Sequence, residues 1–229
     1  MSRQLQTIKQ LQRELDTPKH KVRFTLDGKG SVNFLDLSNL SMETRHLEMV
    51  NNFPDLIVLW AKNNNIDKIK GIDNLTKVRW VDFNYNNISK IENLENLVSI
   101  EDLSLGGNKI EKMENFGHLS RLESIALFNN NITRIEGLKG LKRLVYVTLW
   151  GNDLDNIDEF EEVVEDHINA TVLIFVKPKG KQNPLLSEYS GSISTAEVSN
   201  VTSGQYNMLK WDKREHRYYP LEVDMYQKG

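Results

Sequence analysis

Side chains that commonly carry out catalysis are few and scattered in this 229-residue sequence. The chain contains no cysteine, so metal sites built on thiolate ligands are excluded. No Gly-x-Ser-x-Gly motif is present to hold a nucleophilic serine, and no histidine pairs with an acidic residue at a recurring spacing. The histidines lie far apart in the sequence, at His20, His46, His118, His167 and His216. We therefore predict that the protein is not an enzyme and uses no metal or cofactor.

Two short segments have the composition of ligand-binding loops but not their spacing. Residues 27–31, Asp-Gly-Lys-Gly-Ser, lack the glycine spacing and the following helix of a phosphate-binding loop. The acidic run from Asp158 to Asp166 lacks the Asp/Asn/Gly pattern of a calcium loop and is interpreted as the solvated face of a helix. The chemistry that remains is recognition by aromatic and charged side chains. Where these side chains lie depends on the fold.

The pattern LxxLxLxxNxI occurs five times between residues 56 and 154. Apolar residues two apart within it, such as Leu103 and Leu105, point to one side of a short strand. A repeat this short cannot bury its own apolar side, so successive repeats must stack and pair their strands in parallel. Asparagine can satisfy backbone N–H and C=O groups where each coil leaves the sheet. We expect a buried structural ladder at Asn64, Asn86, Asn108, Asn130 and Asn152.

The second half of each repeat has apolar residues three apart, for example Ile88, Ile91, Leu94 and Leu97. This spacing favours short 3-10-like turns over a full helix. The complete pattern, LxxLxLxxNxIxxIxxLxxL, resembles the 22-residue class of leucine-rich repeats typified by the regulatory subunit of protein phosphatase 1. The expected fold is an α/β leucine-rich-repeat solenoid, a curved horseshoe with a concave parallel sheet of about six to seven short strands. Its convex side should carry 3-10 or short helical turns, and both ends should be capped.

The pattern divides the chain into four predicted parts. Residues 1–31 combine helical spacing with a short alternating strand, which predicts an N-terminal helix and hairpin cap. Residues 32–154 are the repeats, of which the first is degenerate, as terminal repeats often are. Residues 155–176 predict a C-terminal cap helix and strand. Residues 177–229 predict an extended or disordered tail with an aromatic and basic docking segment that includes Trp211, Tyr218 and Tyr219.

Residues that alternate with the buried frame should lie on the concave face of the sheet. Three of the four tryptophans fall there, although tryptophan usually lies in cores or interfaces. Trp60 and Trp80 lie on adjacent coils and can touch, and Phe128 and Trp150 are expected side by side. Two consecutive glycines between these pairs predict a shallow notch. The candidate partner-binding residues on this face are Phe34, Asp36, Trp60, Lys62, Trp80, Asp82, Tyr85, Asp102, Phe128, Tyr146 and Trp150.

The sequence is compatible with two functions. The first is a scaffold that binds a protein partner on its concave face. The resemblance implies that such an adaptor could be phosphatase-regulatory or associated with cilia and dynein. The second is a ribonucleoprotein component similar to spliceosomal leucine-rich-repeat subunits, which would bind RNA through the basic and aromatic tail. A net charge of −3 argues against a membrane surface and disfavours nucleic acid as a partner.

Cellular location is predicted from composition. Extracellular leucine-rich-repeat proteins usually carry disulfide-bonded caps, and this sequence has no cysteine. It begins with a polar segment and contains no apolar span of about 20 residues. We therefore expect an intracellular protein of the cytoplasm, the cilium and cytoskeleton, or the nucleus, rather than a secreted one.

Overall fold

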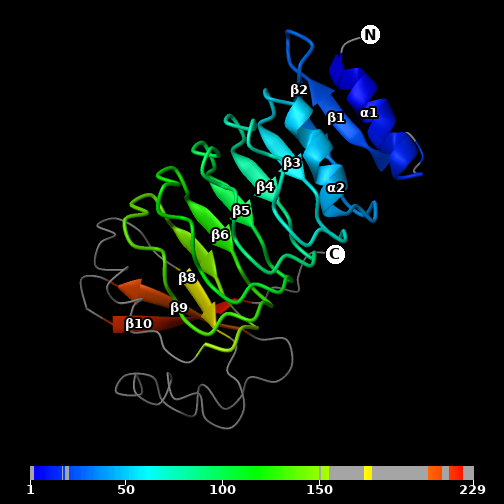
Figure 1. Ribbon diagram of the computed structural model, residues 1–229. Helices are drawn as coiled ribbons and strands as arrows, with labels where there is room; N and C mark the ends of the chain where they lie inside the picture. The colour runs from blue at the N-terminus through cyan, green and yellow to red at the C-terminus, as the bar shows by residue number, and fades with distance from the viewer. Residues whose placement is uncertain are drawn as a thin grey trace.

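The computed structural model describes residues 3–16, 18, 21–149, 151–154, 173–176, 206–212 and 217–223. Its strands form one sheet in which neighbours in space are also neighbours in sequence (Figure 1). The elements are α1 (Arg3–Glu14), β1 (Arg23–Leu26), β2 (Val32–Asp36), α2 (Thr44–Leu47), η2 (Glu48–Asn52), β3 (Val58–Trp60), β4 (Trp80–Asp82), β5 (Asp102–Ser104), β6 (Ser124–Ala126), β7 (Tyr146–Thr148), β8 (Leu173–Val176), β9 (Tyr206–Asp212) and β10 (Arg217–Val223).

Seven consecutive strands, β2 to β8, pair in parallel. Each repeat contributes one short strand, and the register from β2 to β7 follows the repeat without a slip. The predicted solenoid with a parallel sheet is therefore confirmed. One row of paired, buried residues runs across these strands and consists of Leu35, Leu59, Val81, Leu103, Ile125 and Val147.

The apolar positions of the repeat form a single hydrophobic core that runs through the stacked coils. No coil could bury this surface alone, so the stacking itself stabilises the fold. Phe53, Phe83 and Phe116 are the bulkiest of its fully buried side chains. At the N-terminal end, Ile8 and Leu11 of α1 join the same core, and the helix covers the apolar end of the first coil.

The five ladder asparagines are all buried, and each is hydrogen-bonded to backbone groups. Asn86 illustrates the arrangement. Its Nδ2 donates to the carbonyl oxygens of Ala61 and Phe83, both at 3.0 Å, and its Oδ1 accepts from the N–H of Ile66 at 3.1 Å. Ala61 and Ile66 belong to the preceding coil. One side chain thus forms hydrogen bonds with backbone groups of two coils and stabilises their stacking.

The first repeat has Leu40 where the asparagine would stand, and the structure explains the exception. The cap before this repeat includes α1, whose Gln4 Oε1 accepts a hydrogen bond from the N–H of Val32 at 2.8 Å. An asparagine at position 40 would have no preceding coil to bind. The next asparagine, Asn64, serves the first repeat by accepting from the N–H groups of Leu40 and Met42, at 3.0 and 2.9 Å.

The convex side of the described repeats is built from turns, and α2 and η2 occur only in the first repeat. In the second repeat the N–H of Leu75 donates to the carbonyl oxygen of Ile72, and the N–H of Val78 donates to that of Leu75, both at 3.0 Å. These bonds span three residues, so the apolar spacing by threes corresponds to two successive tight turns. They place the apolar side chains on the inside of the coil.

A second asparagine position on the convex side was not predicted. Asn93 and Asn115 stand at the same place in successive repeats and have φ angles of 58° and 65°. Each Nδ2 donates to a carbonyl oxygen of the preceding coil, that of Ile69 or Ile91, at 2.6 Å. Asparagine suits this place because it tolerates the left-handed conformation better than most residues and can also donate.

Antiparallel strands flank the parallel part of the sheet at both ends. β1 pairs with β2, while β9 pairs with β8 and β10 pairs with β9. We expected residues 177–229 to form an extended or disordered tail, but the strands β9 and β10 within it extend the sheet. The edge of β8 offers unpaired backbone groups, and β9 hydrogen-bonds to them. The helix of the C-terminal cap predicted within residues 155–176 lies outside the described residues, which resume at β8.

Candidate functional site

The concave face of the sheet carries most of the large apolar side chains that the described chain exposes. Trp60, Trp80, Tyr85 and Tyr146 all belong to this face, and the two tryptophans are 39% and 38% exposed. The central residue of each short strand from β3 to β7 is buried, so its neighbours must point away from the core. The repeat therefore forces these aromatic side chains toward solvent.

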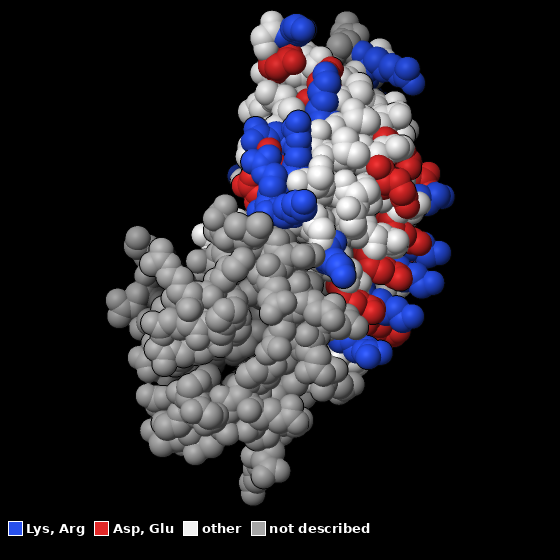
Figure 2. All heavy atoms as spheres, turned by 90° about the vertical axis from the view of Figure 1, so that its left-hand side faces the viewer, with Lys and Arg blue, Asp and Glu red and all other residues white. Residues whose placement is uncertain are grey.

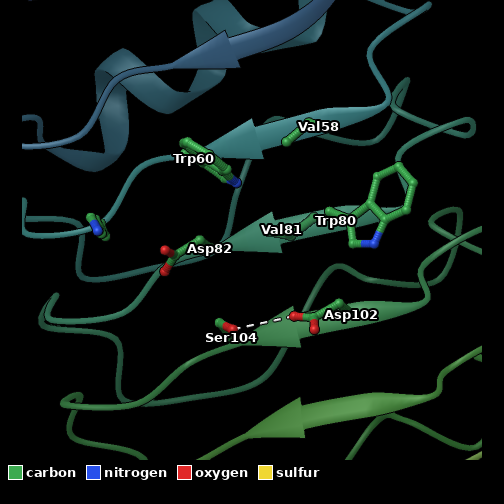
Figure 3. A pocket seen from close by; sticks show the side chains of 8 residues that line it. Val58, Trp60, Trp80, Val81, Asp82, Asp102 and Ser104 are labelled. Atoms are coloured by element: carbon green, nitrogen blue, oxygen red, sulfur yellow. Dashed lines mark hydrogen bonds between the residues drawn. The ribbon is translucent and has the colours of Figure 1, made fainter. Parts of the chain in front are cut away.

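A depression of about 360 Å³ lies on this face over β3, β4 and β5 (Figure 3). Trp60 extends from β3 and Trp80 from β4, at opposite ends of the depression, with carboxylates of β4 and β5 between and beside them. We call this hollow the Trp–Asp depression. It is lined by Val58, Trp60, Lys62, Trp80, Val81, Asp82, Asp102 and Ser104.

The two tryptophans, which can touch by their place on adjacent coils, do not stand directly opposite one another in the sheet. In the register of the sheet Trp60 is paired with Asp82, and Trp80 is paired with Asp102. The indoles are therefore offset by two residues along the strands. Each indole has another neighbour: the Trp60 ring meets Phe34 edge to face, with centroids 5.1 Å apart, while the Arg79 guanidinium carbon lies 4.4 Å from the Trp80 ring centroid.

The predicted notch at Gly106 and Gly107 is also wrong, because aromatic rings fill it. Tyr85 and Phe128 reach over the glycines from the two adjacent coils and meet edge to face, with centroids 5.9 Å apart. A Cβ at Gly106 would overlap the Phe128 ring, and one at Gly107 would lie 2.5 Å from the Tyr85 ring. The glycines thus accommodate an aromatic bridge. Trp150, the expected neighbour of Phe128, lies outside the described residues.

Tyr85 has a strained backbone, with a φ angle of 55°. The same place in neighbouring repeats is held by Asn63, Gly107 and Asn129, residue types that tolerate positive φ values. A tyrosine there costs stability, yet its ring is half exposed and packs on Phe128. Such strain often occurs where a side chain is used for binding.

The carboxylates of the concave face differ in how they are neutralised. Asp36 is buried and forms an ion pair with Arg23 of β1. Asp82 and Asp102 form no ion pair within the described chain, and their nearest hydrogen-bond donors are neutral. Asp82 Oδ1 accepts from the N–H of Asn84 at 2.9 Å, and Asp102 Oδ1 accepts from the Ser104 hydroxyl at 3.3 Å.

Burial in the sheet raises the pKa of both unpaired carboxyls above the ordinary value. For Asp82, this effect outweighs the backbone hydrogen bond and the positive charge of Lys62, which lower the pKa. For Asp102, burial likewise outweighs hydrogen bonds from serine hydroxyls. At neutral pH the folded protein therefore holds two carboxylates that would be more favourably solvated in the unfolded chain.

Replacing Asp102 by asparagine is expected to raise the melting temperature at pH 7. The folded-state pKa of Asp102 lies above its unfolded value, so ionisation costs stability at pH values above the folded pKa. This cost falls as the pH decreases through that pKa and vanishes below the unfolded value. The gain from Asp102→Asn should shrink in the same direction, as thermal melts between pH 7 and pH 3 would show. A gain that persists in acid would contradict this explanation.

The remaining predicted site residues are spread more widely. Lys62 is exposed and lines the depression, and Tyr146 lies exposed on β7. In the tail, Trp211 lies in β9 and is paired with Tyr218 of β10, beside Tyr219. The sequence reasoning missed Arg79, which stacks on an indole, because the residue before the exposed strand positions had no assigned role. The sequence feature that could have indicated the position of Arg79 is Glu101, which stands at the equivalent place one repeat later and forms an ion pair with Arg79 at 2.5 Å.

The described residues contain no group of three or more histidine or acidic side chains placed to hold a metal ion. In the same part of the chain, no helix is long and apolar enough to cross a membrane.

Comparisons with known proteins support the fold. A family model for leucine-rich repeats, built from two repeat copies, matches residues 120–162. An internalin (InlF) from Listeria monocytogenes shares 24% identity over 58% of this chain, with a TM-score of 0.50. No match was found among curated proteins.

Two other solved structures are similar. The leucine-rich-repeat domain of APL1B shares 19% identity over 52% of this chain, with a TM-score of 0.49. The LRIM1/APL1C complex shares 20% identity over 53% of this chain, also with a TM-score of 0.49. This chain spans 38%, 38% and 24% of the internalin, APL1B and LRIM1/APL1C chains. The chain thus contains leucine-rich repeats and folds as a leucine-rich-repeat solenoid.

Proposed function

We propose that the protein is a non-catalytic scaffold that binds a protein partner through the concave face of its sheet. The observation that carries the proposal is the pair of exposed tryptophans, Trp60 and Trp80, around the Trp–Asp depression. Tryptophan is enriched among residues that dominate binding energies and rare at exposed positions that have no use. The apolar frame stabilises the fold without these indoles, so their exposure is best explained by a partner that covers them.

The resemblance to the 22-residue class makes phosphatase-regulatory and dynein-associated adaptors the first candidates within this function. A ribonucleoprotein role is less well supported. The face that carries the tryptophans also carries Asp82 and Asp102, whose carboxylates form no ion pair within the described chain and would repel a phosphate backbone. On the side of the molecule shown in Figure 2, basic side chains gather in one patch, while acidic and basic side chains alternate along the opposite border. The chain as a whole carries a net charge of −3, which favours protein over nucleic acid as the partner.

Site-specific photocrosslinking tests the proposal with two matched valines. Val58 lines the depression, and Val98 is 48% exposed outside it. A photoreactive p-benzoylphenylalanine is placed at either position, the protein is irradiated in cell extract, and the adducts are identified by mass spectrometry. We expect a discrete adduct from position 58 and none of the same mass from position 98. Adducts from position 98 alone would place the interface away from the concave face.

A further inference from the structure

We infer that the Trp–Asp depression receives an arginine side chain of the protein partner, with the guanidinium against the indoles and between the carboxylates of Asp82 and Asp102. This inference rests on the proposed function and specifies the chemistry of its central contact. It is carried by the residues that line the depression, by the pairing of tryptophan with aspartate across the strands, and by two arginines of the chain itself.

The depression combines the two kinds of group that bind a guanidinium. Each tryptophan lies directly across the sheet from a carboxylate: Trp60 from Asp82, and Trp80 from Asp102 (Figure 3). Neighbouring strands are about 4.8 Å apart, so a cation on the indole is within reach of the carboxylate on the next strand. A planar guanidinium can stack on an aromatic ring while its edge donates two hydrogen bonds to a carboxylate.

Among the described residues, Asp82 in the depression lacks the arginine partner that the equivalent Asp36 has. Asp36 and Asp82 stand at the same place in their repeats, on the two sides of Trp60 in the register. Asp36 is neutralised by Arg23, which arrives from β1. Asp82 has no arginine or lysine in an ion pair within the described chain. An arginine supplied by a partner would complete at Asp82 the pairing that the chain completes by itself at Asp36.

The stacking half of the contact is also already present in the molecule. The guanidinium of Arg79 lies over the ring of Trp80, 4.4 Å from its centroid, and is held there by Glu101. An arginine of this chain thus stacks on one of the two indoles while bound to a carboxylate. The proposed contact repeats this arrangement on the side of the indoles that faces the depression. Because both carboxylates are partly desolvated, the attraction for a cation is stronger than at an open surface.

The test uses two peptides that differ only in charge. One is the capped pentapeptide Gly-Gly-Arg-Gly-Gly, and the other has citrulline, a neutral analogue of arginine, in place of arginine. The full-length protein is labelled on its tryptophan side chains, and the indole N–H resonances are followed by nuclear magnetic resonance. Trp60→Phe and Trp80→Phe identify the two resonances. We expect saturable shifts of both with the arginine peptide, and shifts smaller by roughly tenfold or more with citrulline.

Matched aspartate variants locate the carboxylates that matter. Asp82→Asn combined with Asp102→Asn should weaken binding of the arginine peptide by about tenfold or more, since the charge partners are removed while the depression stays intact. Asp73→Asn removes the same charge from an exposed turn after β3 and should leave the affinity unchanged. Circular dichroism melts of each variant show whether the fold is retained.

Several outcomes would overturn the inference. Equal binding of the arginine and citrulline peptides would show that charge is not recognised. Shifts that spare Trp60 and Trp80 would place the cation elsewhere, and a complete absence of shifts would mean that an uncharged surface or another segment of this chain occupies the depression. If any of these results is obtained and position 58 still gives a specific crosslink, the inference is wrong but the proposed function is supported. If the arginine peptide binds as expected but position 58 gives no crosslink to a protein, the proposed function is wrong instead.

Discussion

Replacing Asn108 by alanine is expected to lower the free energy of unfolding by about 3 kcal/mol, because each unsatisfied buried polar group costs ~1–3 kcal/mol. Asn108 Oδ1 accepts from the N–H of Ile88 at 3.0 Å, and its Nδ2 donates to the carbonyl oxygens of Phe83 and Leu105 at 3.0 and 2.9 Å. The side chain is only 8% exposed, so water cannot easily replace it. Urea denaturation followed by circular dichroism would measure the loss as a lower midpoint.

Asn131 supplies the matched control for this experiment. It is an asparagine in the adjacent repeat, but it is exposed, and the bond it makes is through its backbone N–H to the carbonyl oxygen of Ile110. Asn131→Ala should therefore change the unfolding free energy by about 0.5 kcal/mol or less. If both variants lose the same amount, the stabilisation does not come from the buried ladder.

Replacing Trp60 and Trp80 together by alanine is expected to abolish capture of the partner identified by crosslinking. Truncating a central aromatic anchor typically costs about 2 kcal/mol or more of binding energy, so the combined loss should exceed a hundredfold in affinity if the two anchors act roughly additively. The melting temperature should change little, because both indoles are more than a third exposed. Biolayer interferometry with the purified partner would measure the affinity.

Val98→Ala is the control for the tryptophan variants. Val98 is exposed, apolar and outside the depression, so its truncation should alter neither binding nor stability appreciably. Normal binding by the double tryptophan variant would mean that the partner uses another surface. A variant that unfolds would instead show that the indoles contribute to the core, and single substitutions would then separate their contributions.

The repeat made most of the fold predictable because its period fixes both the strand register and the direction of every side chain. Once Leu59 and Val81 are recognised as equivalent, the exposure of Trp60 and Trp80 follows. What the period does not determine is how exposed side chains turn. The rings of Tyr85 and Phe128 close over two glycines because each reaches across from its own coil, and the repeat pattern describes only where a side chain begins.

The tail was harder to predict for a different reason. Basic and aromatic residues around Trp211 indicated a docking segment. Aromatic residues are also common in β-strands, so the composition alone does not distinguish the two. The pairing of β9 with β8 depends on an unpaired edge that exists only once the solenoid has formed. Such a long-range contact has no local signal. The stacking of Arg79 on Trp80 was missed similarly, since it depends on the position of Glu101 one coil later.

The asparagine ladder has a direction, and this has a consequence for synthesis on the ribosome. Each asparagine binds backbone groups of its own coil and of the coil before it; for instance Asn130 Oδ1 accepts from the N–H of Ile110, 20 residues earlier. A coil that has emerged from the exit tunnel is therefore complete only when the next asparagine has also left the tunnel. Folding should proceed vectorially from the N-terminal cap, one coil behind elongation. A stalled nascent chain whose emerged part ends just before Asn130 would lack the side chain that completes its last emerged coil.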